Sequence, residues 1–202
     1  MLQVIRDEDI AITCICETWF DSQKGKHKAV IKEEGFKVTH ENRGGKRGGG
    51  VAIIYRQQCK IKKGEGSTEK YSSFEYVYCI LQTTEFKVLL VCLYRLQEVS
   101  FTTFCDEIEK FMEAIFHKGD QVIVIGDFNE WAEEQNADSM NLLTMMNAFG
   151  LSQCIQGATR HTLDQVCVNE HQMKMNRKIG DRTGISIARR GVSPPILSPC
   201  NA

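Results

Sequence analysis

The sequence predicts an α/β protein built as one globular domain. The chain has 202 residues, 42% of them hydrophobic, and strand-like runs recur along it with helical segments between them. A chain of this length can bury a substantial core within one domain. Six runs are rich in β-branched and aromatic residues and bounded by turn residues, so each is expected to form a strand. They cover residues 10–16, 50–55, 74–81, 87–94, 122–125 and 163–168.

Two helices are expected in the second half of the chain. The first follows Ser100, the expected N-cap, carries apolar residues at helical spacing and ends at Gly119. One apolar face of this helix should therefore pack on the sheet. The second is expected over residues 137–150. Its expected cap is Asp138 or Ser139, and its expected terminator is Gly150.

Cysteine usage and charge limit the class of protein. Several of the nine cysteines lie inside apolar runs, where a reduced thiol behaves as a small hydrophobe. Cys14 and Cys16 have the wrong spacing for zinc, and strand alternation places both on one face, so core packing is expected. No apolar stretch reaches the length of a membrane span, and the N-terminal segment turns acidic where a signal peptide needs apolar residues. We expect an intracellular protein, nuclear or cytoplasmic, with no membrane partner.

Two further segments have a distinct composition. Residues 40–50, "HENRGGKRGGG", are glycine-rich and locally basic, which predicts a mobile hairpin connection that either is a solvated turn or holds a polyanion. The net charge of −1 gives no global attraction to nucleic acid, so a local patch of this kind would be required. Residues 169–202 carry all three prolines and little periodicity, so a poorly ordered tail is expected, in which "GISIA" alone could add a strand.

Polar side chains stand at the ends of several predicted strands. In layered α/β folds ligands bind at strand ends, because polar groups converge there on rigid supports. A carboxylate that enters a strand shares this edge with those that leave one, provided that its strand runs antiparallel. Each group taken alone could also be a solvated strand end or a simple turn. The groups are Glu17, Tyr94 with Arg95, Asp127 with Asn129, and Asp164 entering the last strand.

Clustered carboxylates indicate a cation. Glu17, Asp127 and Asp164 would repel one another unless a positive charge compensates. An oxygen-rich site without His or Cys ligands suits Mg²⁺, which a substrate phosphate usually completes. Hydrolysis of a phosphate ester needs a metal, a group that orients water and a further donor. Glu17, Asp127 with Asn129, and Tyr94 can supply these in that order.

Five segments together resemble the endonuclease/exonuclease/phosphatase superfamily, and within it the endonuclease domains of non-long-terminal-repeat retrotransposons. They are "DIAITCICETWF", "RGGKRGGGVAIIYR", "KVLLVCLYR", "VIVIGDFNEW" and "ATRHTLDQVCV", and the resemblance covers residues 9–168. It implies a four-layered α/β sandwich of the DNase I-like type, with mixed sheets, over residues 1–168. It also implies hydrolysis of phosphate esters in DNA, RNA, phosphoinositides or sphingomyelin with Mg²⁺ or Mn²⁺.

The resemblance assigns expected roles to individual residues. Glu17 matches the metal-binding glutamate, Tyr94 the catalytic tyrosine, and Asp127 with Asn129 the pair that handles water and phosphate. Asp164 matches the aspartate that orients the family's histidine. The retrotransposon branch nicks DNA, so DNA is the expected partner, RNA is the alternative, and no obligate protein partner is evident. The basic residues expected to hold the substrate are Arg43, Lys46, Arg47 and Arg95.

The sequence departs from the family pattern at both ends. The asparagine of the family's first strand has no counterpart, and no Ser-Asp-His motif follows Asp164. His161 and His171 have the wrong surroundings to replace it, and "YRLQ" stands where this branch commonly has two prolines. We expect a Mg²⁺-dependent phosphodiesterase, foremost a DNA endonuclease of the retrotransposon type. The alternatives are an inactive fragment or degenerate copy that keeps the fold, and a phosphoinositide or sphingolipid phosphoesterase.

Overall fold

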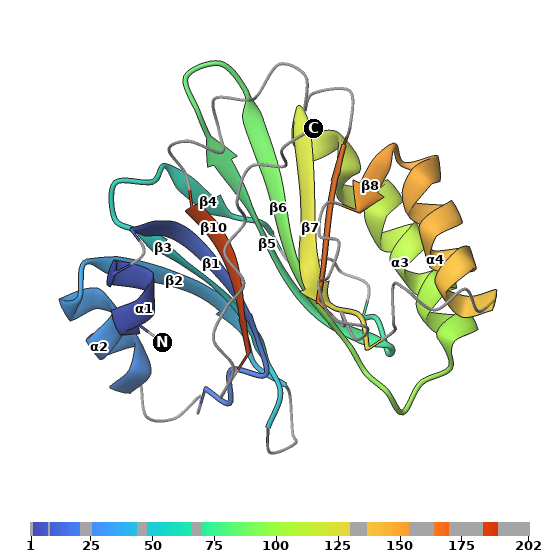
Figure 1. The fold of residues 1–202 in the computed structure, drawn as a ribbon, viewed down its shortest axis with the longest axis horizontal. Helices are drawn as coiled ribbons and strands as arrows, with labels where there is room; N and C mark the ends of the chain where they lie inside the picture. The colour runs from blue at the N-terminus through green and yellow to red at the C-terminus, as the bar shows by residue number, and fades with distance from the viewer. Residues whose placement is uncertain are drawn as a thin grey trace.

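Two β-sheets pack face to face between two layers of helices. The computed structural model describes residues 2–7, 9–20, 26–43, 48–65, 70–129, 137–153, 164–169 and 184–189. In Figure 1 one pair of helices lies outside the first sheet and a second pair lies outside the other sheet, which gives four layers in the order α/β/β/α. The expected four-layered α/β sandwich is therefore confirmed.

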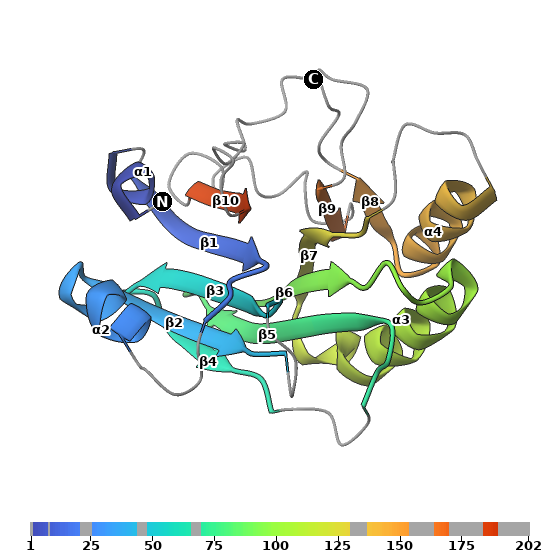
Figure 2. The same ribbon diagram turned by 90° about the horizontal axis from the view of Figure 1, so that it is seen from below.

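Figure 2 shows the strands of both sheets, each of which has a simple order. The first has the order β10-β1-β3-β2, in which β10 runs parallel to β1 and the other pairs are antiparallel. Its strands are β1 (Ile10–Cys16), β2 (Phe36–Glu41), β3 (Val51–Arg56) and β10 (Gly184–Arg189). The second has the order β4-β5-β6-β7-β9-β8, with β6 and β7 parallel. Its strands are β4 (Ile61–Lys63), β5 (Phe74–Gln82), β6 (Lys87–Arg95), β7 (Gln121–Asp127), β8 (Leu151–Gln153) and β9 (Asp164–Asn169).

The helices cover the outer faces of the sheets (Figure 1). The helices over the first sheet are α1 (Leu2–Asp7) and α2 (Lys26–Glu33). Those over the second are α3 (Phe101–Ile115), which continues into a 3₁₀ turn over Phe116–Lys118, and α4 (Ala137–Ala148). No helix in the described ranges combines the length and the apolar character that crossing a bilayer would require.

Alternation along the strands divides the core into three parts. On β6, Leu89, Val91 and Leu93 pack toward α3, whereas Leu90 and Cys92 pack toward the first sheet. This period of two follows from the pleat of a β-strand, which sends successive side chains to opposite faces. Because both faces of β6 are covered, its residues from Val88 to Leu93 are all apolar and buried. The apolar core between the two sheets therefore ends at the edge of the sandwich where β6 ends.

The thiols of the core between the sheets confirm the expected packing of cysteine. Cys14, Cys16 and Cys92 are each at most 1% exposed and belong to this core. The Cys16 thiol donates to the carbonyl of Leu93 at 3.3 Å, and the Cys92 thiol donates to the carbonyl of Ile15 at 3.8 Å. These small side chains allow β1 and β6 to approach closely. All seven cysteines in the described ranges are free thiols.

The six predicted strands are present, with bounds within two residues of those expected. The sequence reading missed three strands and two helices. β4 and β8 have three residues each, too few for a periodic pattern, and β2 was missed because four of its six residues are polar. The loop expected over residues 40–50 starts later, since His40 and Glu41 belong to β2. The "GISIA" segment does form a strand, β10, which ends at Arg189, and Asn169 is the last residue of β9; the rest of the expected tail lies outside the described residues.

The predicted helices are confirmed, with one wrong cap. Ser100 caps α3, because its Oγ accepts a hydrogen bond from the Thr103 N–H at 3.2 Å. The buried stripe of α3 consists of Phe101, Phe104, Ile108, Phe111, Met112 and Ile115. α4 begins at Ala137, so Asp138 and Ser139 lie inside its first turn, where Asp138 favours the helix dipole instead of capping it. Gly150 follows α4 with φ +66°, as a terminator requires.

Glu107 on α3 fixes the start of β5. Its carboxylate accepts hydrogen bonds from both the backbone N–H and the hydroxyl of Ser72 and of Ser73, at 2.5–3.0 Å. Partial burial raises the pKa of Glu107, but the hydrogen bonds from Ser73 and Ser72 outweigh it and leave the pKa below its ordinary value. We expect Glu107→Gln to lower the free energy of unfolding by on the order of 1 kcal/mol at pH 7, discounted for partial exposure. Glu109→Gln, on the same helix and exposed, is the matched control.

The effect of Glu107 should depend on pH in one direction. Because its folded pKa is depressed, it stabilises the fold above the unfolded pKa of about 4.3, and this contribution is lost as pH falls through the folded pKa. Urea unfolding should therefore show a gap between wild type and Glu107→Gln at pH 7 that closes toward pH 3. An equal gap at both values would contradict this account.

Candidate active site

The polar strand ends predicted from the sequence meet at one edge of the sandwich. Tyr94 lies opposite Asp127 in the parallel register of β6 and β7, and Asp127 lies opposite Asp164 in the antiparallel register of β7 and β9. The expectation that Asp164 enters an antiparallel strand at this edge is thus confirmed for the backbone; its side chain lies outside the described part. Tyr94 has the parity of Cys92, so its ring points toward the first sheet.

A hydrogen bond between the two sheets closes this edge. The Tyr94 hydroxyl donates to Glu17 Oε1 at 2.8 Å, and Glu17 is the residue directly after β1. Burial of the ring, together with the hydrogen bond to the Glu17 carboxylate and its charge, raises the pKa of Tyr94 to about 12. Asp127 adds to this rise, and Asn129 opposes it. Tyr94 is therefore protonated at neutral pH, and its hydroxyl serves as a hydrogen-bond donor.

Asp127 and Asn129 form a fixed unit after β7. Asp127 is 4% exposed, and its Oδ1 accepts the backbone N–H of Asn129 at 3.0 Å. The Asn129 side chain donates through Nδ2 to the carbonyl of Arg95 at 2.7 Å and accepts through Oδ1 from Gln97 Nε2 at 2.8 Å. Gln97, which sequence reasoning did not select, thus fixes the orientation of the amide. The one sequence signal for Gln97 was the segment "YRLQ", which stands where the retrotransposon branch commonly has two prolines.

Glycine is required at position 126, directly before Asp127, because β7 packs closely against β6 there. A Cβ at Gly126 would overlap the backbone carbonyl of Leu93 on β6. Glycine therefore lets β6 and β7 approach closely beside the site, which keeps Tyr94 and Asp127 level with each other.

Arg95 has a different position from the one expected of a substrate-binding residue. It is 8% exposed, and its guanidinium donates to the carbonyls of Phe128, Asn129 and Val99 at 3.2–3.4 Å. It also lies over the Phe101 ring, 5.0 Å from the centroid. The buried guanidinium of Arg95 holds the loop that carries Asn129, and little of it is exposed to a substrate.

Three consecutive glycines support the residues after β1. Gly48, Gly49 and Gly50 have φ of +92°, +72° and +87°, a conformation that favours glycine. The carbonyl of Gly50 accepts the N–H of Thr18 at 3.0 Å, and the carbonyl of Gly49 accepts the N–H of Trp19 at 2.9 Å. Residues 48–50, which we call the triglycine platform, are therefore hydrogen-bonded to the residues directly after Glu17.

Side chains occupy the space that the triglycine platform leaves open. The Trp19 ring rests on Gly48, and the Arg43 guanidinium lies where a side chain at Gly49 would be. Arg43 forms an ion pair with Glu75, and the other oxygen of Glu75 accepts the N–H of Gly50 at 2.7 Å. The guanidinium also lies 5.8 Å from the centroid of the Tyr94 ring. Sequence reasoning missed Glu75, because a single glutamate inside a strand carries no signal.

Backbone strain is concentrated at this site. Among the described residues other than glycine, four have positive φ, and three of them are Glu17, Trp19 and Asn129. A left-handed conformation costs roughly 1–2 kcal/mol for most side chains, less for Asn. Such strain persists where the surrounding structure determines it, and it is common at functional sites. Lys46 and Arg47, the other two basic residues of the predicted loop, lie outside the described residues.

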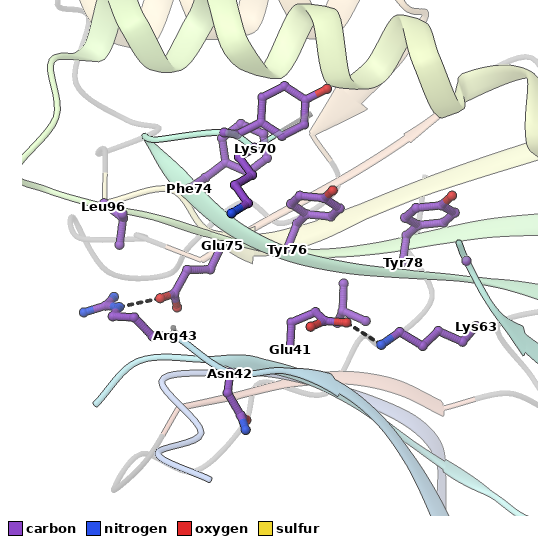
Figure 3. Close-up of a pocket in the computed structure, with 13 residues that line it drawn as sticks. Glu41, Asn42, Arg43, Lys63, Lys70, Phe74, Glu75, Tyr76, Tyr78 and Leu96 are labelled. Carbon is purple, nitrogen blue, oxygen red and sulfur yellow. Dashed lines mark hydrogen bonds and ion pairs between the residues drawn. The ribbon is translucent and has the colours of Figure 1, made fainter. Parts of the chain in front are cut away.

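A groove opens beside Arg43, between β5 and the end of β2. It encloses about 610 Å³ and is lined by both charged and aromatic side chains. Figure 3 shows the ion pairs Arg43–Glu75 and Lys63–Glu41 on its wall, with the Lys70 ammonium directed toward Glu75. The rings of Tyr76 and Tyr78 point away toward α3, as their parity on β5 requires. The groove thus adds two carboxylates, Glu41 and Glu75, each of which is paired with a basic side chain.

The donor set of this edge fits a hard cation. Glu17 is exposed at the end of β1 in the first sheet, and Asp127 lies at the end of β7 in the second sheet. The available ligands are therefore carboxylate oxygens. Among the side chains that the structure describes, no group of three His, Cys, Asp or Glu is arranged to hold a metal ion. One or two carboxylates, with water and a substrate phosphate, are the usual ligands of Mg²⁺ in phosphoryl-transfer sites. The residues present fit that arrangement.

The hydrogen bond from Tyr94 to Glu17 leads to a testable prediction for the pKa of Tyr94. With a pKa of about 12, Tyr94 should be about nine-tenths protonated at pH 11, where an ordinary tyrosine is about nine-tenths ionised. Glu17→Gln removes the negative charge and should lower the pKa of Tyr94. NMR of protein labelled at tyrosine Cζ, with Tyr94→Phe assigning the resonance and circular dichroism confirming the fold at pH 11, measures both. Ordinary titration of Tyr94 in the wild type would contradict the geometry.

Comparison with solved structures identifies the fold. The endonuclease domain of TRAS1, a telomere-specific non-LTR retrotransposon, matches with a TM-score of 0.64 and 16% identity over 86% of this chain and 80% of that domain. The human Nocturnin catalytic domain with bound sulfate matches with a TM-score of 0.62 and 16% identity over 84% and 73%. The Neisseria 3′ phosphatase NExo, bound to a product DNA hairpin, matches with a TM-score of 0.53 and 12% identity over 84% and 80%. At these identities the likeness shows the fold alone.

The sequence itself matches a family model. Residues 1–174 match the model of the Endonuclease/Exonuclease/phosphatase family, which is most of the chain and includes every strand end described above. No curated protein matches the sequence. Members of the family are generally hydrolases, nucleases and phosphatases among them. The chain belongs to the Endonuclease/Exonuclease/phosphatase family.

Proposed function

We propose that this protein is a Mg²⁺- or Mn²⁺-dependent phosphodiesterase that nicks DNA, of the type found in retrotransposon endonucleases. The observation that carries the proposal is the hydrogen bond from Tyr94 to Glu17, because it joins the two sheets at the edge where Asp127 and Asn129 also lie. The carboxylate that we propose for the cation, a buried carboxylate and a phenol thereby lie within one polar edge.

Each residue of this edge has a proposed role in hydrolysis. Glu17 would hold the cation, which when bound supplies positive charge to a phosphoryl oxygen. Asp127 would accept a proton from the attacking water, as the new O–P bond forms and the bond to the leaving oxygen breaks. Its orientation is supported by the N–H of Asn129, whose own amide is held by Arg95 and Gln97. Asp164, beside Asp127 in register, would belong to the same edge.

Tyr94 and Arg43 would act on the phosphate. Tyr94 stays protonated at neutral pH and can direct its hydroxyl at a phosphoryl oxygen when a substrate competes for it. Arg43 places a fixed positive charge beside the Tyr94 ring, and Glu75 holds that charge in position. Guanidinium groups suit phosphate because their planar donors match its oxygens. This charge could assist the phosphate in a chain that lacks the family's histidine.

The choice of DNA over other phosphate esters rests on the sequence and the surface of the site. The five motif segments resemble the retrotransposon branch, and the groove beside Arg43 adds Lys63 and Lys70 along the edge of the site. Lysine and arginine contacts to phosphates supply affinity that does not depend on sequence. RNA shares this chemistry and is the alternative nucleic acid.

One observation favours a second candidate function. The sequence has no Ser-Asp-His motif after Asp164, and loss of a single group that stabilises transition-state charge commonly costs two or more orders of magnitude in rate. The alternative is therefore a protein that keeps the fold and binds nucleic acid with no turnover. It predicts salt-dependent DNA binding without metal-dependent cleavage.

Nicking of supercoiled plasmid separates the two functions. With Mg²⁺ or Mn²⁺ at low salt, the proposal predicts metal-dependent nicking that a chelator abolishes and that Glu17→Ala lowers by at least about 100-fold. Glu85→Ala is the matched control, because Glu85 is exposed in the turn between β5 and β6, at the end of the strands remote from Tyr94. A folded protein that binds DNA but does not nick it, or nicking that survives Glu17→Ala, would contradict the proposed activity.

A further inference from the structure

Strand β10 lies at the edge of the first sheet and comes from a part of the chain beyond the family match. The match ends at residue 174, whereas β10 covers Gly184–Arg189. Figure 2 shows β10 beside β1, and the two strands run in the same direction. Their register is continuous from Ile12, opposite Ile185, to Cys16, opposite Arg189. A segment outside the family match therefore forms the edge strand next to β1.

The parallel direction brings the end of β10 to the candidate active site. In layered α/β folds, ligands bind outside the carboxyl ends of the strands, and parallel neighbours have these ends at the same edge of the sheet. β1 ends at Cys16, Glu17 follows it directly, and Arg189 is the last residue of β10. Neighbouring strands lie about 4.7–4.9 Å apart. Arg189 therefore has a register position next to the residue that precedes Glu17.

The sequence of β10 has the same form as the other strands that end at this edge. It reads "GISIARR" from Gly184 to Arg190, an uncharged run that changes abruptly to two arginines. The first arginine closes the strand, and Arg190 lies outside the described residues. Apolar runs also lead into Glu17, Tyr94 and Asp127, which are the acidic and phenolic groups of the site. β10 therefore adds a basic residue to an edge that is otherwise rich in carboxylates.

A positive charge at this edge would balance the charge of a bound substrate. Glu17 and Asp127 are both carboxylates, and a phosphate beside them brings further negative charge. Two arginines already described at the site bind protein groups, since Arg43 pairs with Glu75 and the Arg95 guanidinium donates to backbone carbonyls. The sequence also lacks the Ser-Asp-His motif of the family. A further cation would thus help to hold the phosphate.

We propose that Arg189 binds the substrate phosphate at the edge that holds Glu17. This inference rests on the proposed function, and it adds to the site a residue from outside the family match. A guanidinium has planar donors that match two phosphate oxygens, and it remains charged throughout the working range of pH. Arg189 binds the phosphate and transfers no proton. β10 then contributes to substrate binding in addition to completing the sheet.

Salt-dependent DNA binding in chelator tests the phosphate contact without requiring turnover. Anisotropy of a labelled DNA duplex gives the affinity of wild type, Arg189→Gln and Arg189→Lys over a series of salt concentrations. Loss of one phosphate contact should reduce the slope of log K against log salt by about 1. We expect this reduction in Arg189→Gln, whereas Arg189→Lys keeps the charge and should restore most of the slope. Lys37→Gln is the matched control, because Lys37 is an exposed cation of the same sheet at the end remote from Glu17.

Hydrogen exchange followed by NMR tests the placement of β10. Amides of residues 185–189 that pair with β1 should exchange slowly, and Arg189→Gln should leave both this protection and the urea midpoint unchanged. Exchange of all these amides at the rate of an unfolded peptide would overturn the inference, because Arg189 would then have no fixed position at the site. An unchanged salt slope in Arg189→Gln, an equal loss in Lys37→Gln, or no binding of DNA by the wild type would also overturn it.

The outcome is separable from that of the proposed activity. If the wild type nicks plasmid, Arg189→Gln should lower the nicking rate at saturating protein by at least about tenfold. An unchanged rate would leave the phosphodiesterase in place and refute the contact of Arg189 with the reacting phosphate. DNA binding that depends on Arg189, without nicking by the wild type, would establish the phosphate contact and refute catalysis. The two experiments therefore fail independently.

Discussion

The contact on which the site depends is the hydrogen bond from Tyr94 to Glu17. Two facing sheets pack about 10 Å apart, so a polar group on one reaches the other only through a long side chain. Tyr94 has this length, and strand parity points it at the first sheet. Beneath it, Cys16 and Cys92 are small enough for each thiol to donate to a carbonyl of the opposite sheet. Apolar packing between the sheets thus sets the distance at which the carboxylate and the phenol meet.

The same constraint explains why so many neighbouring residues are small or strained. Gly126 lets β6 and β7 lie close, and the triglycine platform accepts the strained backbone of Trp19. Glu75 then connects the platform to the second sheet, since one oxygen holds Gly50 and the other holds Arg43. The rim of the site is consequently a continuous network from β1 through the glycines to β5, and a change at one of these points should alter the position of the others.

Strands and their polar ends could be predicted from sequence, because both depend on local pattern. The placement of Glu17, Tyr94 and Asp127 at one edge follows from where each apolar run stops. The parts that escaped prediction depend on contacts between distant segments: Glu75 on β5 binds Arg43 after β2, and Gln97 binds Asn129. Arg95 was expected to contact substrate because it follows Tyr94, but alternation turns it to the opposite face of β6, where aromatic rings of α3 surround it.

Binding of Mn²⁺ followed by electron paramagnetic resonance tests most directly whether this edge is a cation site. At low salt, the signal of free Mn²⁺ reports how much of the ion the protein takes up, independently of turnover or DNA. The account predicts one binding site in the wild type, weakened by at least about tenfold in Glu17→Gln and unchanged in Glu85→Gln. Equal uptake by wild type and Glu17→Gln would show that Glu17 does not hold the cation, and the proposed arrangement of the site would be wrong.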